Sequence, residues 1–91
     1  MPLSIILKTE LKSGRMTIAR SSAGKVEYAD VRSAENEASR MRFRDDAANY
    51  CVYSGLFDDL REATLYVQLR NQGLSTSQAW KRVKPNAHRS V

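Results

Sequence analysis

Cysteine and histidine are almost missing from this chain of 91 residues, which has one of each. The single cysteine, Cys51, excludes an intramolecular disulfide and a cysteine-based zinc site. The single histidine, His88, stands near the end of the chain, where a Cys–His catalytic dyad is poorly supported. A P-loop is also missing, because Gly24-Lys25 is followed by Val26 where Ser or Thr is required. We therefore expect no enzyme activity, no metal and no cofactor.

Long apolar runs are missing too. No stretch approaches the ~18 apolar residues that a membrane span requires, and the short apolar run near the N-terminus lacks the basic flank of a signal peptide. With 42% hydrophobic and 27% charged residues, the composition is typical of a globular protein. The length allows one domain, so we expect residues 1–91 to form a single cytoplasmic domain.

Acidic residues are absent from the last third of the chain. Residues 63–91 contain no Asp or Glu and hold Arg70, Lys81, Arg82, Lys84 and Arg89. This segment carries the whole net charge of +5, because residues 1–30 and 31–62 contribute +2 and −2. Basic charge confined to one end indicates a surface that meets an anionic partner, either a nucleic acid or an acidic protein face.

The first third of the chain is predicted to form strands. Residues 3–11, 15–20 and 26–28 alternate between apolar and polar side chains, and short turn signals separate them. Such short links favour an antiparallel β-meander within residues 1–31. The first run is expected to bury one face, formed by Leu3, Ile5, Leu7 and Leu11.

The rest of the chain is predicted to be helical. From Ser33, a possible N-cap, apolar residues recur at three- to four-residue steps as far as Val52, with Cys51 beside them. A second helix is expected to be capped by Asp58 or Asp59 and to end near Gly73. A short basic helix follows and ends before a proline, with residues 86–91 as a flexible tail. We thus expect an α+β fold, in which two longer helices and this short C-terminal helix, within residues 32–85, pack on an N-terminal three-stranded antiparallel sheet.

Residues 64–84 have the outline of a helix-turn-helix. Gly73 stands at the turn, but the position four residues before it is the bulky Leu69 where such motifs prefer a small residue. Ser75 and Gln78 have the spacing of a capping box for the second helix. In that helix Trp80 is expected to pack into the core, although an aromatic residue among basic ones can also stack on a base. The same segment therefore fits either a DNA-reading helix or a basic element that contacts protein.

The candidate binding residues are polar or basic and lie in two clusters. In the C-terminal helix the outer face provides donors for phosphate or bases. In the first predicted helix, two arginines share a face, but Glu37 is placed to neutralise part of their charge. Lys8, Lys12, Arg15 and Arg20 would extend this second cluster if they converge on it. The candidates for contact with nucleic acid or an acidic partner are Gln78, Lys81, Arg82, Lys84, Arg89, Arg40 and Arg44.

In size, single-domain α+β build and absence of a catalytic set, the chain resembles the small accessory proteins of phages and mobile elements, including anti-CRISPR proteins. The resemblance implies steric block of a CRISPR effector, with basic residues meeting acidic protein or guide RNA. We expect a non-enzymatic protein, monomeric or homodimeric, that docks onto a nucleic-acid-handling complex. The alternatives are a helix-turn-helix-like DNA-binding regulator and a structural subunit of a larger assembly.

Overall fold

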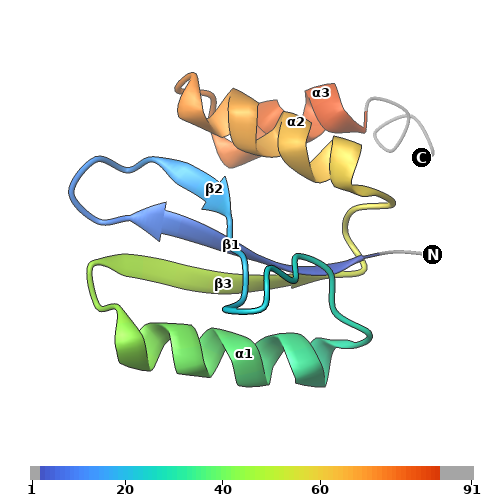
Figure 1. The fold of residues 1–91 in the computed structure, drawn as a ribbon. Coiled ribbons are helices and arrows are strands. Elements are labelled where there is room, and N and C mark those ends of the chain that lie inside the picture. The colour runs from blue at the N-terminus through green and yellow to red at the C-terminus, as the bar shows by residue number, and fades with distance from the viewer. Residues whose placement is uncertain (1–2, 85–91) are drawn as a thin grey trace.

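The computed structural model describes residues 3–84 and shows a three-stranded antiparallel sheet with helices on both faces (Figure 1). The elements follow one another as β1 (Ser4–Glu10), β2 (Met16–Ile18), α1 (Val31–Arg44), β3 (Ala48–Ser54), α2 (Leu60–Asn71) and α3 (Thr76–Val83). The strand order is β2-β1-β3, so the N-terminal strand is central. The predicted α+β class is confirmed. Arg89 and the predicted tail lie outside the described residues.

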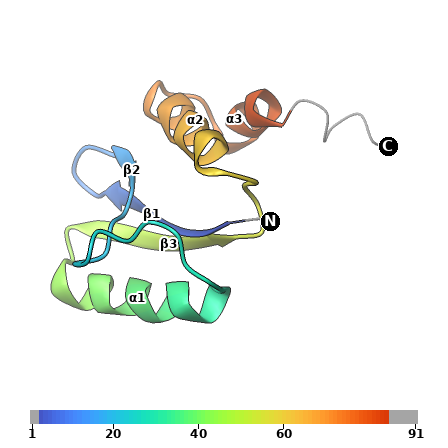
Figure 2. The same ribbon diagram turned by 45° about the vertical axis from the view of Figure 1, so that its right-hand side comes forward.

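The central strand β1 is buried on both faces. Ile5 and Leu7 belong to the core beneath α2 and α3, whereas Ile6 belongs to the core beneath α1. This arrangement follows from the alternation of side chains along a strand. The prediction of one covered face was therefore incomplete, as Figure 2 shows with α1 on one side of the sheet and α2 and α3 on the other. Leu11, predicted to be buried with this face, lies beyond the end of β1 and is 59% exposed.

The third strand is not where the sequence placed it. Residues 26–28, predicted as a strand, contribute only an isolated bridge between Tyr28 and Ser4. The third strand is β3, which pairs with β1 along its whole length, from Ser4 opposite Ser54 to Glu10 opposite Ala48. The prediction of a helix as far as Val52 was therefore wrong, and so was the division into an N-terminal meander and a wholly helical remainder.

Two acidic residues, Asp45 and Asp46, follow the end of the helix, where the helix dipole disfavours negative charge. Helix α1 ends at Arg44, and Asp45 takes up an extended backbone conformation as its C-cap. Beyond it, Tyr50 is buried and Cys51 is exposed. Ala48 and Val52 match a helical spacing, but an even separation also suits a strand. Aromatic and β-branched side chains favour the strand. Cys51, predicted on an apolar helical stripe, is therefore an exposed residue of β3.

The caps of the helices are partly as predicted. Helix α1 is capped by Asp30, whose carboxylate accepts a hydrogen bond from the Ser33 backbone N–H at 2.8 Å, and not by Ser33. Asp59 caps α2, as one of the two predicted candidates. The capping box of α3 is confirmed, since Ser75 and Gln78 each accept a hydrogen bond from the other's backbone N–H.

Each edge strand is covered at one point by a helix side chain. At β2, the Met16 backbone N–H donates to Oδ1 of Asn71 at 2.7 Å, and Nδ2 of Asn71 donates to the Met16 carbonyl at 2.8 Å. At β3, the Arg42 guanidinium donates two hydrogen bonds to the Tyr50 carbonyl. Such contacts occupy groups that an open edge would offer to another strand.

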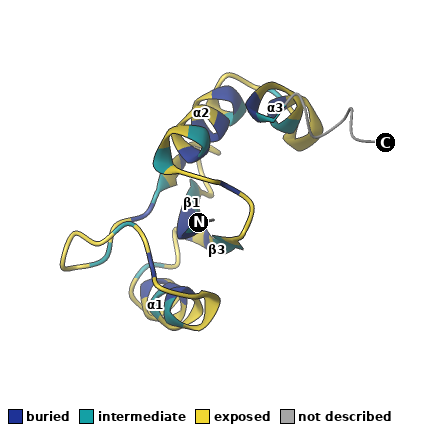
Figure 3. Cartoon of the chain, turned by 90° about the vertical axis from the view of Figure 1, so that its right-hand side faces the viewer, coloured by how far each residue is buried: buried dark blue, intermediate teal, exposed yellow. Residues whose placement is uncertain are grey.

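The sheet separates two hydrophobic cores. The core beneath α1 contains Ala34, Ala38 and Met41. Figure 3 shows the buried side of α1 turned towards the sheet. The core beneath α2 and α3 contains an aromatic cluster. There Trp80 packs with its ring centroid 5.1 Å from those of both Phe57 and Tyr66, which agrees with its predicted core position.

Within residues 3–84, no helix has both the length and the apolar composition that crossing a membrane requires.

Candidate anion-binding surface

The outer face of α3 carries fewer available charges than the sequence suggests. Lys81 and Arg82 are exposed, as predicted. Lys84 contacts the start of α2, with its ammonium 2.9 Å from a carboxylate oxygen of Glu62 and 3.3 Å from one of Asp58. The hydrogen bond to Glu62 is the main cause that raises the pKa of Lys84 above its ordinary value.

Gln78 is also engaged in the fold. Its side-chain oxygen accepts the Ser75 backbone N–H at 2.9 Å and so forms one half of the capping box. The face of α3 therefore consists chiefly of Lys81 and Arg82. Arg89, the remaining C-terminal candidate, lies beyond residue 84, where the described structure ends.

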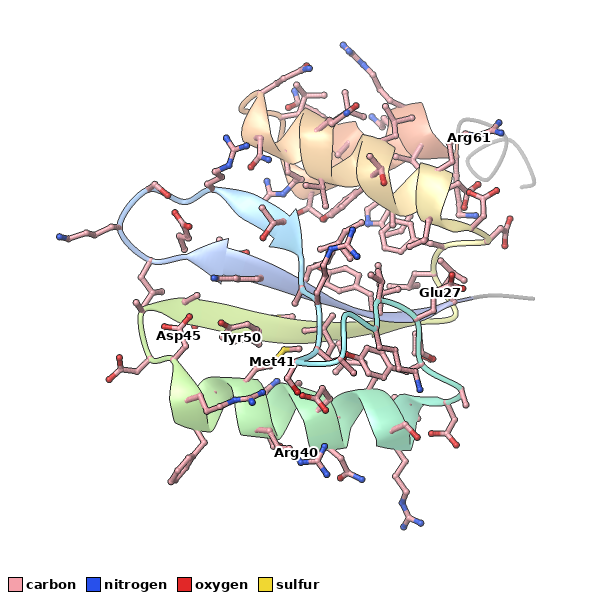
Figure 4. The ribbon with its side chains drawn as sticks, in the orientation of Figure 1. Glu27, Arg40, Met41, Asp45, Tyr50 and Arg61 are labelled. Carbon is pink, nitrogen blue, oxygen red and sulfur yellow. The ribbon has the colours of Figure 1, made fainter. Side chains whose placement is uncertain are left out.

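The two predicted clusters do not converge. Arg40 and Arg44 belong to α1, on the opposite side of the sheet from α3 (Figure 1). Figure 4 shows Met41 pointing from α1 towards the sheet, with Arg40 on the outer side of the helix. Glu37 pairs with Arg40 at 3.0 Å and with Arg44 at 3.3 Å, so part of this charge is neutralised, as the sequence suggested.

The α1 side of the molecule nevertheless gathers further cations. Lys8 lies on the same face of β1 as Ile6, and Thr17 of β2 stands opposite it in the register. Helix α1 packs mainly over β3 and less over β1, which leaves this corner of the sheet open. A hollow of about 460 Å³ results, lined among others by Lys8, Arg20 and Arg44.

A second hollow of about 360 Å³ adjoins the first, since Ser21 and Ser22 line both. Its wall includes Lys25 from the β2–α1 connection and Arg40 from α1. The Ser21 hydroxyl accepts the backbone N–H groups of Ala23 and Lys25, which gives the connection a defined turn. We call the two hollows together the basic groove. Its cationic lining residues are Lys8, Arg20, Lys25, Arg40 and Arg44, and its carboxylates are Glu37 and Asp45. Its hydroxyl-bearing lining residues are Thr17, Ser21, Ser22, Tyr28, Ser33 and Tyr50.

The Asp45 carboxylate of the groove is held by two hydrogen bonds. Asp45 accepts the Tyr50 hydroxyl at 2.7 Å and the Ala47 backbone N–H at 3.0 Å, and the Lys8 ammonium lies 3.7 Å away. The bond from Tyr50 is the largest cause that lowers the pKa of Asp45. Burial is the largest cause that raises the pKa of Tyr50 to about 12. Asp45 and Tyr50 lie next to each other in Figure 4.

This pairing predicts a shift in the Tyr50→Phe variant. Removal of the hydroxyl should raise the pKa of Asp45 towards its ordinary value of 3.8, because the main stabilising hydrogen bond is lost. The lowered pKa means that Asp45 stabilises the fold above its unfolded pKa and loses this effect as pH falls through the folded value. An NMR titration of the Asp45 carboxyl measures the shift. Tyr53→Phe is the control, and an unchanged Asp45 pKa in Tyr50→Phe would contradict the prediction.

Several groove residues were not predicted as binding residues. Lys8 and Arg20 were recognised only as a possible extension, and Lys25 was not singled out. The segment Ser21–Ser22 was interpreted as a turn signal alone. Its hydroxyls between Arg20 and Lys25 are a weak signal for anion binding, and only the packing of this connection beside α1 places them in a groove.

Within residues 3–84 there is no group of three or more His, Cys, Asp or Glu side chains that could hold a metal ion. Cys51 lies exposed on β3. What the groove can do chemically is bind anionic oxygens, through five cationic side chains set against two carboxylates.

No protein-family model, no curated protein and no solved structure matches the chain. Its function therefore has to be inferred from the geometry and chemistry of its surfaces.

Proposed function

We propose that this protein is a small, non-enzymatic binding protein of the cytoplasm that docks onto a nucleic-acid-handling complex through its basic groove. In this proposal it acts by steric block, as a phage-encoded inhibitor of the anti-CRISPR type would. The partner is an anionic macromolecule, and the groove supplies the positively charged contact.

One observation carries the proposal. The basic groove assembles cations from three separate parts of the chain: the strand β1, the β2–α1 connection and the helix α1. Five positive side chains against two carboxylates leave a local excess of three positive charges, and hydroxyls lie between them. Cations interspersed with hydroxyl donors suit the phosphate oxygens of a nucleic acid or the carboxylates of a protein.

A helix-turn-helix-like DNA-binding regulator is the second candidate. It is favoured by the exposed pair Lys81 and Arg82 on α3, and by the turn at Gly73 with a φ of 102° that leads into the capped helix. Leu69, the bulky residue at the position where the motif prefers a small one, is buried in the core beneath α2 and α3. The two candidates place the partner on opposite sides of the sheet, so they are separable by mutation.

A matched pair of double variants tests the proposal. Arg20→Gln/Lys25→Gln removes one arginine and one lysine from the groove, and Lys81→Gln/Arg82→Gln removes the same charges from α3. All four side chains are exposed, so both variants should fold. The tagged protein is used to recover complexes from host lysate, and the recovered complex is identified and assayed for its activity on nucleic acid.

We expect the groove variant to need about 2- to 30-fold more protein for the same inhibition, since each of the two lost exposed charge pairs contributes roughly 0.2–1 kcal/mol. The α3 variant should inhibit like the parent protein. Recovery of bulk nucleic acid alone, without a defined complex, would count against an inhibitor. Loss of salt-dependent duplex binding only in the α3 variant would instead support the regulator.

A further inference from the structure

Phe43 is the most exposed large apolar side chain among the described residues, at 94% exposure. It lies on α1 on the side opposite the buried Ala34, Ala38 and Met41. The other described aromatic residues are buried or half-buried. Packing among residues 3–84 therefore does not account for an aromatic ring at this position.

Phe43 adjoins the basic groove. A shallow, mostly apolar hollow of about 380 Å³ is lined by Ser39, Arg40, Phe43 and Arg44. Arg40 also lines the second hollow of the groove, and Arg44 lines the first. The two arginines thus stand between the groove and the aromatic ring, and a ligand held by them reaches both.

The groove also contains a polar group without a partner. Tyr28 lines the second hollow and is only 9% exposed, and its hydroxyl is buried with no hydrogen-bond partner among the described residues. The Lys25 ammonium lies 5.5 Å from the centre of the same ring. A buried hydroxyl without a partner is unfavourable, and this one belongs to a residue of the groove wall.

Cations beside a free aromatic face are the combination by which proteins bind single-stranded nucleic acid. The cations follow the phosphates, and an unstacked base lies on the ring. A duplex keeps its bases stacked inside and would leave the face of Phe43 unused. The hollows have the size of small-ligand pockets, roughly 300–1,000 Å³, which suits a single strand entering them and not a double helix.

We propose that the basic groove and Phe43 together form a binding site for single-stranded nucleic acid, with phosphates in the groove and one base stacked on Phe43. This inference rests on the proposed function, because it specifies which part of the nucleic-acid-handling complex the groove contacts. Arg40 and Arg44 bridge the two parts of the site, and Thr17, Ser21 and Ser22 offer hydroxyls to the sugar–phosphate chain.

Fluorescence anisotropy with the full chain tests the site. The probes are labelled oligo(dT) and oligo(rU) of about 12 nucleotides, within the span of small single-strand sites, and a duplex of equal length, at ~50 mM salt. Single strands should bind more tightly than the duplex. Phe43→Ala should weaken their binding roughly tenfold, the effect of removing one stacked base, and leave the salt dependence unchanged.

Three variants serve as comparisons. Arg20→Gln/Lys25→Gln should reduce the slope of log K against log salt by about 1.4, since each phosphate contact on a single strand contributes about 0.7. Phe43→Tyr retains a stacking face and should bind like the parent protein. Leu65→Ala, which trims an exposed apolar side chain on α2, should change nothing.

The outcomes separate this inference from the proposed function. Duplex binding as tight as single-strand binding, or an unchanged affinity in Phe43→Ala, overturns the single-strand site. If neither strand binds but Phe43→Ala abolishes recovery of the complex, Phe43 enters a protein pocket; the inference fails and the docking function stands. Single-strand binding that depends on Phe43, without any recovered complex, supports the site and contradicts the docking function. A preference for oligo(rU) or for oligo(dT) supports the site and identifies the sugar.

Discussion

Replacement of Phe57 by alanine is expected to destabilise the protein by about 3–5 kcal/mol, the usual cost of removing a large buried aromatic side chain. Phe57 is fully buried, and its ring centroid lies 5.1 Å from that of Trp80 and 5.5 Å from that of Tyr66. It comes from the loop between β3 and α2, so it joins the sheet to both C-terminal helices. A domain of this size has roughly 5–15 kcal/mol of total stability, and the variant should lose a large part of it.

Urea unfolding followed by far-UV circular dichroism measures this loss. Leu56→Ala, at the neighbouring position with 46% exposure, is the matched control and should change stability by no more than about 0.5 kcal/mol. Phe57→Leu keeps most of the apolar volume, so its loss of stability should lie between those of Phe57→Ala and Leu56→Ala. It serves as the test variant if Phe57→Ala does not fold. Equal stabilities for Phe57→Ala and Leu56→Ala would show that the aromatic cluster does not hold the helices on the sheet.

Replacement of Asn71 by alanine is the second large expected effect, at about 2 kcal/mol. The amide of Asn71 makes two hydrogen bonds with the backbone of Met16, which is 7% exposed. Alanine leaves both backbone groups without this partner, and each unsatisfied buried group costs roughly 1–3 kcal/mol before water compensates. The variant also frees the outer edge of β2.

Hydrogen exchange reports this change at a single amide. The Met16 N–H should exchange faster in Asn71→Ala, together with a lower urea midpoint. Gln72→Ala, the exposed neighbour at the end of α2, should leave both measurements unchanged. Protection of Met16 equal to that in the parent protein would mean that the Asn71 amide does not close this edge.

The fold class follows from local patterns, but the origin of the third strand does not. Alternation identified β1 and β2, and the Ser75–Gln78 capping box identified α3. Residues 48–52 match a helical and a strand spacing equally well. Their aromatic and β-branched side chains favour a strand, and pairing with β1, about forty residues earlier, fixes it. Non-local pairing of this kind leaves no trace in a window of neighbouring residues.

The candidate site was predictable only in part for the same reason. Arg40 and Arg44 were identified from their shared helical face, and the partial neutralisation by Glu37 was expected from spacing. Their convergence with Lys8 and Lys25 depends on how the β2–α1 connection lies beside α1. The opposite error arose at Lys84, whose charge is committed to Glu62 and Asp58 by the packing of α3 against α2.

The central position of the first strand has a consequence for the order of folding. During synthesis, β1 leaves the ribosome long before β3, its main partner, which ends at Ser54. Until then the apolar run Ile5–Ile6–Leu7 has only the three-residue β2 beside it and is open to pairing with other chains. Lys8, Glu10 and Lys12 follow this run directly, where charged residues act as gatekeepers against aggregation. By this argument, the charge of Lys8 disfavours aggregation of the nascent strand, and the Lys8 side chain lines the basic groove once the protein has folded.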